Sequence, residues 1–139
     1  MFDRDGCGSG GQRQDLENQV EELLARNGWQ DRCGAIAIDP ELENWVGICL
    51  SSPTAQAVIG WPHGGKDLKD YFHEQRSLRS GIRRLDRPKE TFLQALRLAG
   101  VPRSAALYFD LSTKAPITEC VDPAFLKLRT TLERWFPPR

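Results

Sequence analysis

The 139-residue chain has the length of one domain, and its 40% hydrophobic and 27% charged residues predict an ordinary globular core. Its four cysteines form no Cys-x-x-Cys pair and no cluster with histidine, which argues against a zinc module and against a disulfide scaffold. No charged leader opens the chain and no apolar run is long enough to span a membrane, so we expect a cytoplasmic protein with no membrane partner.

The formal net charge of 0 conceals two segments of opposite charge. Residues 1–50 hold ten acidic and four basic side chains, a net charge of −6, whereas residues 76–103 hold eight basic and two acidic side chains, a net charge of +6. This asymmetry predicts that the first segment holds cations and that the second meets phosphates. Charged helix faces exposed to water would explain the same asymmetry.

The first part of the chain predicts a strand, a helix and a second strand. Residues 1–6 have the pattern of a strand end, and the glycine-rich residues 6–11 predict a loop. An apolar stripe predicts a helix over residues 15–27, and the short apolar run at residues 35–38 favours a buried strand. This order predicts a right-handed βαβ unit with parallel strands.

Proline marks the starts of the helices predicted further along the chain. Asp39-Pro40, Ser52-Pro53 and Asp122-Pro123 each place a capping residue before a proline that suits the first helical position. Apolar stripes and stop signals predict further helices at residues 88–100, 104–111 and 122–135. We therefore expect a mostly helical C-terminal half.

Carboxylates follow both predicted strands. Asp3 and Asp5 share one side of an extended strand, at the edge where open α/β sheets bind ligands. Glu41 and Glu43 follow the second strand, and because parallel strands end at the same edge we expect the two groups to converge. Carboxylates are ligands of choice for Mg²⁺ or Mn²⁺. Such a set would hold the ion, activate water and steady the leaving oxygen in phosphodiester cleavage.

Plainer interpretations of these carboxylates stay open. The two N-terminal aspartates would also suit a polar tail. Asp39 would also suit a helix cap, with Glu41 and Glu43 complementing the positive end of that helix. In a regular helix these two glutamates point about 200° apart, so at most one would reach the metal. We favour Glu41, which would then be catalytic together with Asp3 and Asp5.

Residues of the positive segment are candidates for phosphate contacts. Arg83 and Arg84 lie in its middle, whereas Lys89, Arg103 and Ser104 lie at or near predicted helix starts. Backbone N–H groups at a helix start favour anions, and basic side chains contact phosphate. These five residues predict an interface for DNA or RNA. Surface solubility and helix capping would account for the same residues equally well.

Five strings of residues together resemble a known family. Phe-Asp-Arg-Asp-Gly-Cys-Gly at 2–8 and Ile-Asp-Pro-Glu-Leu-Glu-Asn-Trp-Val at 38–46 are similar to the small TOPRIM-related proteins of bacterial defence loci. Arg-Pro-Lys-Glu at 87–90, Pro-Arg-Ser-Ala-Ala-Leu-Tyr at 102–108 and Cys-Val-Asp-Pro-Ala-Phe-Leu-Lys-Leu at 120–128 strengthen the resemblance. Within this family the chain looks like a component of the methylation-associated antiphage defence system.

The resemblance implies a TOPRIM-like α/β fold with a helical extension and a divalent-metal acidic site. Asp3 and Asp5 match the Asp-x-Asp element of the family, and Glu41 and Glu43 match its second acidic motif. TOPRIM domains also use a glutamate on an earlier strand, in a segment that precedes the Asp-x-Asp strand and that this sequence does not include. The resemblance therefore implies either a misassigned start of the chain or a truncated homologue, and in a truncated homologue a ligand or base of the site would be missing.

We accordingly expect a truncated TOPRIM-like α/β portion at residues 1–50 and a helical extension at residues 51–139, packed together as one compact domain. Two functions follow from the resemblance: a metal-dependent nuclease of the defence system, or a non-catalytic subunit that binds nucleic acid or protein. The expected partners are DNA or RNA and other proteins of the same system. A sheet without its early strands would leave an open edge, which favours a homo-oligomer.

Overall fold

The computed structural model describes residues 1–49, 52–62, 67–68, 70–71, 87–117 and 120–138. The chain divides into two compact units, which we call the βαβ unit (residues 1–41 and 121–139) and the helical unit (residues 42–120). This division differs from the sequence-based boundary in two respects: the first break falls after residue 41 and not after residue 50, and the last helix belongs with the beginning of the chain. Among the described residues, no helix is long and apolar enough to cross a bilayer.

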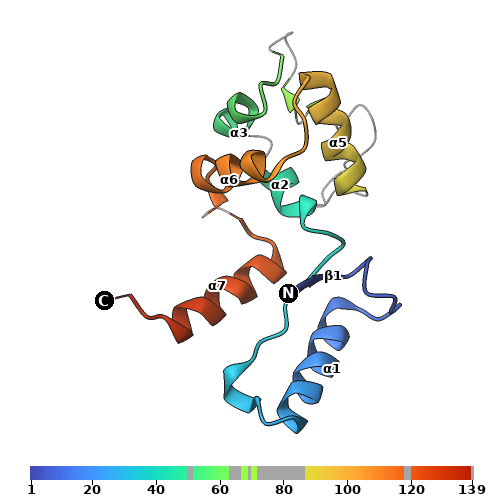
Figure 1. The fold of residues 1–139 in the computed structure, drawn as a ribbon, viewed down its shortest axis with the longest axis vertical. Helices are drawn as coiled ribbons and strands as arrows, with labels where there is room; N and C mark the ends of the chain where they lie inside the picture. The colour runs from blue at the N-terminus through green and yellow to red at the C-terminus, as the bar shows by residue number, and fades with distance from the viewer. Residues whose placement is uncertain (50–51, 63–66, 69, 72–86, 118–119, 139) are drawn as a thin grey trace. The chain divides into compact units, whose positions relative to one another are not determined.

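Two short strands and two longer helices make up most of the βαβ unit (Figure 1). Its elements in chain order are β1 (Phe2–Asp3), α1 (Arg13–Arg26), the 3₁₀ helix η1 (Gln30–Arg32), β2 (Ala37–Ile38) and α7 (Pro123–Trp135). β1 and β2 pair in parallel, with Phe2 opposite Ala37 and Asp3 opposite Ile38. The predicted parallel βαβ order is therefore confirmed, and the fold is mixed α/β.

Backbone hydrogen bonds extend the pairing of the two strands beyond their regular part. They join Phe2 N to Ile36 O (3.0 Å), Arg4 N to Ile38 O (2.8 Å) and Asp5 N to Pro40 O (3.2 Å). Residues 2–5 consequently run beside the segment from Ile36 to Pro40, which contains β2. This register brings the residues after β1 to the same edge as the residues after β2.

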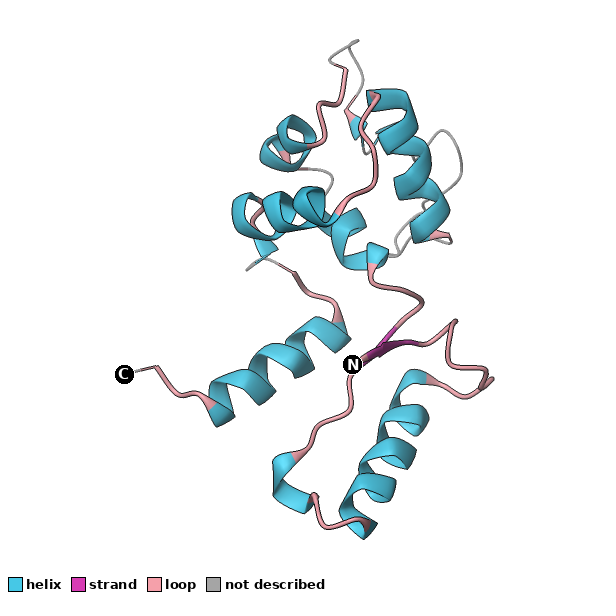
Figure 2. Ribbon diagram, viewed as in Figure 1, coloured by secondary structure: helices cyan, strands magenta, loops and turns pink. Residues whose placement is uncertain are grey.

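The helical unit is built around a cluster of buried apolar side chains. Its described helices are α2 (Glu43–Cys49), α3 (Pro53–Val58), α5 (Pro88–Ala99) and α6 (Ala105–Lys114), drawn in cyan in Figure 2. α2 contacts α5 and α3 contacts α6. The cluster comprises Ala55, Ile59, Trp61, Leu68, Phe92, Ala95, Leu96, Leu107, Leu111 and Ala115. Burial of this apolar surface supplies most of the stabilisation expected for the unit.

Local signals for helix ends were correct at several positions. The Ser52 and Asp122 side chains cap α3 and α7, each followed by proline at the first helical position. Gly100 ends α5 in the left-handed conformation, with φ of 69°. Pro40, in contrast, does not start a helix: α2 begins at Glu43. The prediction failed there because the Pro40 carbonyl continues the ladder with the first strand segment.

Candidate functional site

The ends of β1 and β2 carry the carboxylates for which a site was predicted. Asp3 is half-buried at the end of β1, and Asp5 is exposed two residues later. Arg4 joins the two strand ends, because one guanidinium nitrogen lies 3.1 Å from Asp5 Oδ1 and another lies 3.2 Å from Asp39 Oδ1. We call Arg4, Asp5 and Asp39 the strand-end cluster. The sequence pointed to this edge but missed both Arg4 and Asp39 as members.

Glu41 and Glu43 lie in different units, although only one residue separates them. Glu41 is half-buried and ends the first segment of the βαβ unit, just after the Pro40 carbonyl that accepts from Asp5 N. Glu43 is buried at the start of α2 in the helical unit. The two glutamates are therefore held by different sets of neighbours.

Hydrogen bonds within the helical unit engage the Glu43 carboxylate. Its Oε1 accepts from Arg103 Nη2 at 3.1 Å and from the Tyr108 hydroxyl at 3.0 Å. Burial raises the pKa of Tyr108; Arg103 opposes this rise, while the nearby Glu43 charge adds to it. The charge of the Glu43 carboxylate is therefore already balanced by the positive charge of the Arg103 guanidinium. Coordination of a metal by Glu43 would have to compete with both bonds.

Metal-binding groups of three or more histidine, cysteine, aspartate or glutamate side chains are absent from the described part of the chain. The Mg²⁺ or Mn²⁺ site predicted for Asp3, Asp5, Glu41 and Glu43 therefore stays a prediction. At the strand-end cluster the charge of Arg4 offsets part of the negative charge of the carboxylates. A divalent ion could replace that charge, because carboxylate oxygens suit both kinds of cation.

The residues predicted to contact phosphate have distinct surroundings. Lys89 is exposed in the first turn of α5. Arg103 is bound to Glu43 and Tyr108, with its guanidinium 5.6 Å from the Tyr108 ring centroid. The Ser104 hydroxyl caps α6 by accepting from Leu107 N at 3.2 Å, which is the plainer role considered for it. Arg83 and Arg84 lie outside the described residues.

Sequence reasoning missed a network of charged residues inside the βαβ unit. Glu17 on α1 is only 2% exposed, and its Oε1 accepts from Ala37 N at 3.0 Å and from Arg13 at 2.7 Å. Lys127 on α7 donates to Glu17 Oε2 at 3.1 Å and to Glu21 Oε1 at 2.9 Å. We call Arg13, Glu17, Glu21 and Lys127 the charge network. The only sequence signal was two glutamates four residues apart beside the apolar stripe of α1.

The network shifts the proton affinity of two of its members. Burial alone would raise the pKa of Glu21, but hydrogen bonds from Lys127 and Ala35 N and the charges of Lys127 and Arg134 hold it below its ordinary value. Burial alone would lower the pKa of Lys127, but hydrogen bonds and charges from Glu21 and Glu17 raise it. Both groups are therefore held in their charged forms, and they join α1 to α7.

The chain is thus a mixed α/β protein, mostly helical, with a two-stranded parallel sheet. No family model, curated protein or solved structure matches it. Its resemblance to TOPRIM-related defence proteins rests on sequence motifs and stays a hypothesis.

Proposed function

We propose that this chain is a TOPRIM-like component of a bacterial antiphage defence system that uses Mg²⁺ or Mn²⁺ to cleave phosphodiester bonds in nucleic acid. The observation that supports the proposal is the parallel ladder, which aligns the end of β1 with the end of β2. Asp3 and Asp5 on one segment thereby share an edge with Asp39 and Glu41 on the other. Open α/β sheets bind their ligands at this edge.

Each residue of the edge has a role in this proposal. Asp3 and Asp5 would hold the ion, and Glu41 would accept the proton of the attacking water as the oxygen–phosphorus bond forms and the bond to the leaving sugar oxygen breaks. When bound, the ion would supply charge stabilisation for the phosphoryl oxygens. Arg4 holds the carboxylates of the strand-end cluster together through its ion pairs with Asp5 and Asp39.

Nicking of supercoiled plasmid DNA tests the proposal. We expect the chain to nick DNA with Mg²⁺ or Mn²⁺ and to stop when a chelator is added. Asp3→Ala and Asp5→Ala should each reduce the rate more than about 100-fold, because even residues that only orient metal ligands cost 10- to 100-fold. Asp15→Ala, at an exposed position in the first turn of α1, is the matched control and should leave the rate unchanged.

Calorimetric titration with Mn²⁺ separates binding of the ion from catalysis. The wild-type chain should bind Mn²⁺, and Asp3→Ala and Asp5→Ala should bind it more weakly. Equal nicking by wild type and both variants would identify a contaminating nuclease. Absence of both nicking and Mn²⁺ binding would rule out the catalytic proposal.

A second function, a non-catalytic subunit that binds nucleic acid or another protein of the defence system, is favoured by the surroundings of Glu43. One of the four predicted metal ligands is buried and already paired with Arg103 within the helical unit. An acidic set that has lost a ligand to an ion pair suits a protein that binds without cleaving. The exposed Lys89 and the basic residues Arg83 and Arg84 would then contact phosphates.

Nucleic-acid binding in the presence of a chelator tests this second function. Affinity should fall steeply with added salt, because each neutralised phosphate releases counterions. Replacing both Arg83 and Arg84 with alanine, or Lys89 alone, should weaken binding and flatten the salt dependence. Arg26→Ala, at an exposed position on α1, serves as the control. Salt-independent binding, or equal affinity in all variants, would contradict it.

A further inference from the structure

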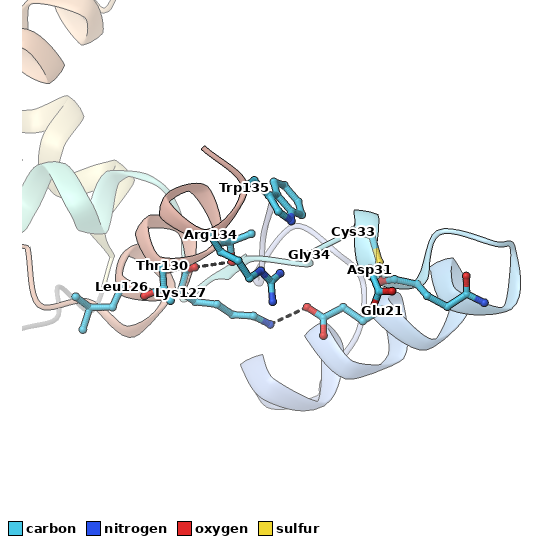
Figure 3. A pocket seen from close by; sticks show the side chains of 11 residues that line it. Glu21, Asp31, Cys33, Gly34, Leu126, Lys127, Thr130, Arg134 and Trp135 are labelled. Atoms are coloured by element: carbon cyan, nitrogen blue, oxygen red, sulfur yellow. Dashed lines mark hydrogen bonds and ion pairs between the residues drawn. The ribbon is translucent and has the colours of Figure 1, made fainter. Parts of the chain in front are cut away.

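A groove of about 850 Å³ opens in the βαβ unit between α1, η1 and α7. Its lining, shown in Figure 3, comprises Glu21, Gln30, Asp31, Cys33, Gly34, Leu126, Lys127, Thr130, Thr131, Arg134 and Trp135. The groove shares no residue with the strand-end cluster. Its volume falls within the range of small-molecule sites, roughly 300–1,000 Å³. The lining combines one aromatic ring, charges of both signs and two hydroxyls.

Gly34 lets α7 approach the segment before β2 closely. A side-chain carbon at this position would lie 3.3 Å from Thr131 Cγ2 and 3.9 Å from Trp135 Cη2. One edge of the Trp135 ring therefore lies near the backbone of Gly34, and 38% of the surface of this residue stays exposed. A ring placed in this way is held in position yet presents surface on which a flat ligand can stack.

Donors and acceptors with spare capacity line the same groove as this ring. Lys127 Nζ carries three protons and uses two of them on Glu17 and Glu21, so one remains. Within the described residues, neither Arg134 nor Asp31 forms a side-chain hydrogen bond or an ion pair. In Figure 3, Lys127 and Arg134 both extend from α7 toward Glu21 on α1. The groove thus offers a guanidinium, an ammonium proton and a carboxylate beside an aromatic surface.

We propose that this groove binds a nucleotide, with the base stacked on Trp135 and the phosphate held by Arg134 and Lys127. Aromatic side chains bind bases by stacking, and a guanidinium matches the geometry of phosphate. The Asp31 carboxylate accepts from the amino or imino groups of the base, as carboxylates do at cytosine. A free mononucleotide and the end of a single strand present the same chemistry. The site needs no metal and does not depend on the strand-end cluster.

Calorimetric titration of the full chain, in buffer containing a chelator, tests the proposal. The probes are the nucleoside monophosphates, the matching nucleosides and inorganic phosphate. We expect the monophosphates to bind more tightly than either part alone. Trp135→Ala should weaken binding about tenfold, since the stacking of one base raises affinity by about tenfold or more. Arg134→Ala should weaken binding of monophosphates by a similar factor and leave binding of nucleosides unchanged.

Two matched controls lie in the same unit. Trp29 is exposed and stacks with Arg32, and Arg129 is on α7 beside Glu133; neither lines the groove. Trp29→Ala and Arg129→Ala should bind as wild type. Because all four substituted side chains are exposed, circular dichroism should show every variant folded. Trp135→Phe, which keeps an aromatic surface, should retain most of the affinity.

The source of the nucleotide is decided by competition with a short single-stranded oligonucleotide. Tighter binding of the oligonucleotide identifies a strand end as the ligand, and tighter binding of the monophosphate identifies a free nucleotide; both support the site. Absence of nucleotide binding, unchanged affinity in Trp135→Ala and Arg134→Ala, or inorganic phosphate binding as tightly as the monophosphates would overturn it. Because no metal is present, the result is independent of the nicking and Mn²⁺ assays.

Discussion

The two units of this protein are stabilised by different kinds of contact. In the helical unit, large apolar side chains such as Phe92, Ile59 and Leu96 pack in one cluster. Among the described residues, the βαβ unit has fewer buried apolar side chains, three of them alanines, and the buried Glu17 carboxylate lies among them. Apolar packing therefore dominates one unit, whereas charged hydrogen bonds decide which elements meet in the other.

The difference also shows in how each unit uses its buried carboxylate. Glu43 pairs with Arg103 and Tyr108, and the Tyr108 ring then packs on Phe92 with centroids 5.9 Å apart. Glu17 instead bonds the backbone of β2 and the Lys127 side chain of α7 at once. The first carboxylate lies at the margin of an apolar core, and the second joins three elements of its unit. Loss of the second should therefore affect more of its unit.

The largest expected effect is the loss of the central ring of the helical unit. Phe92 is 0% exposed, so Phe92→Ala removes buried surface and leaves a cavity that costs about 3–5 kcal/mol of unfolding free energy. Urea unfolding combined with hydrogen exchange of the α5 and α6 amides measures this loss. Phe109→Ala, at a position 67% exposed, should change it by less than about 0.5 kcal/mol. Equal losses would contradict an apolar core in this unit.

Glu17→Ala probes the βαβ unit in the same way. The substitution leaves Ala37 N without its acceptor and removes one of the two partners of Lys127. We expect a loss of about 2–3 kcal/mol, because buried polar groups left unsatisfied carry their full desolvation cost. Faster hydrogen exchange in α1, β2 and α7 would report it. Glu22→Ala, which removes an exposed pair with Arg26, should cost less than about 0.5 kcal/mol.

Removal of a helix cap should cause a loss of unfolding free energy of intermediate size, and each unit offers one such cap. Asp122 accepts from Ala124 N and Phe125 N at the start of α7, and Ser104 accepts from Leu107 N at the start of α6. Asp122→Ala and Ser104→Ala should each cost about 1 kcal/mol. Thermal unfolding measures both losses. If Asp122→Ala released the exchange protection of β2 as well, α7 would be shown to hold that strand in place.

The smallest expected effect is a dependence on acid pH in the βαβ unit. The pKa of Glu21 lies below its ordinary value of 4.5, so its charged form stabilises the folded unit above that pH. This contribution is lost as the pH falls from about 4.5 through the lowered value. Glu21→Gln should flatten the stability profile below pH 4.5, as followed by urea unfolding at several pH values. An unchanged acid profile would contradict a role for the Glu21–Lys127 pair.

Local patterns sufficed for the parts of the fold that neighbouring residues determine. The apolar stripe of α1, the buried run before Asp39, the caps Ser52 and Asp122 and the stop at Gly100 each depend on residues a few positions apart. The helix start predicted at Asp39-Pro40 was wrong, because the Pro40 carbonyl pairs instead with Asp5 N, which lies 35 residues earlier in the chain. Propensity is a weak guide wherever long-range pairing competes with it.

The candidate sites divide in the same way. Asp3 and Asp5 were placed at a strand end by their own neighbours in sequence, and parallel pairing accounts for their common edge with Asp39. Lys127 meets Glu17 across 110 positions of the chain, and a contact of that range leaves no periodic trace in either segment.

The amino-acid order alone therefore specified the strand–helix–strand order, the helix caps and the acidic strand end, because each follows from interactions within about one turn or one strand. Tertiary packing decided that α7 joins the βαβ unit, that Glu43 pairs with Arg103, and that Trp135 and Arg134 line one groove together with Asp31 and Gly34. These choices depend on which surfaces fit and which charges can be paired once the chain is compact, and such choices are made between residues far apart in the sequence.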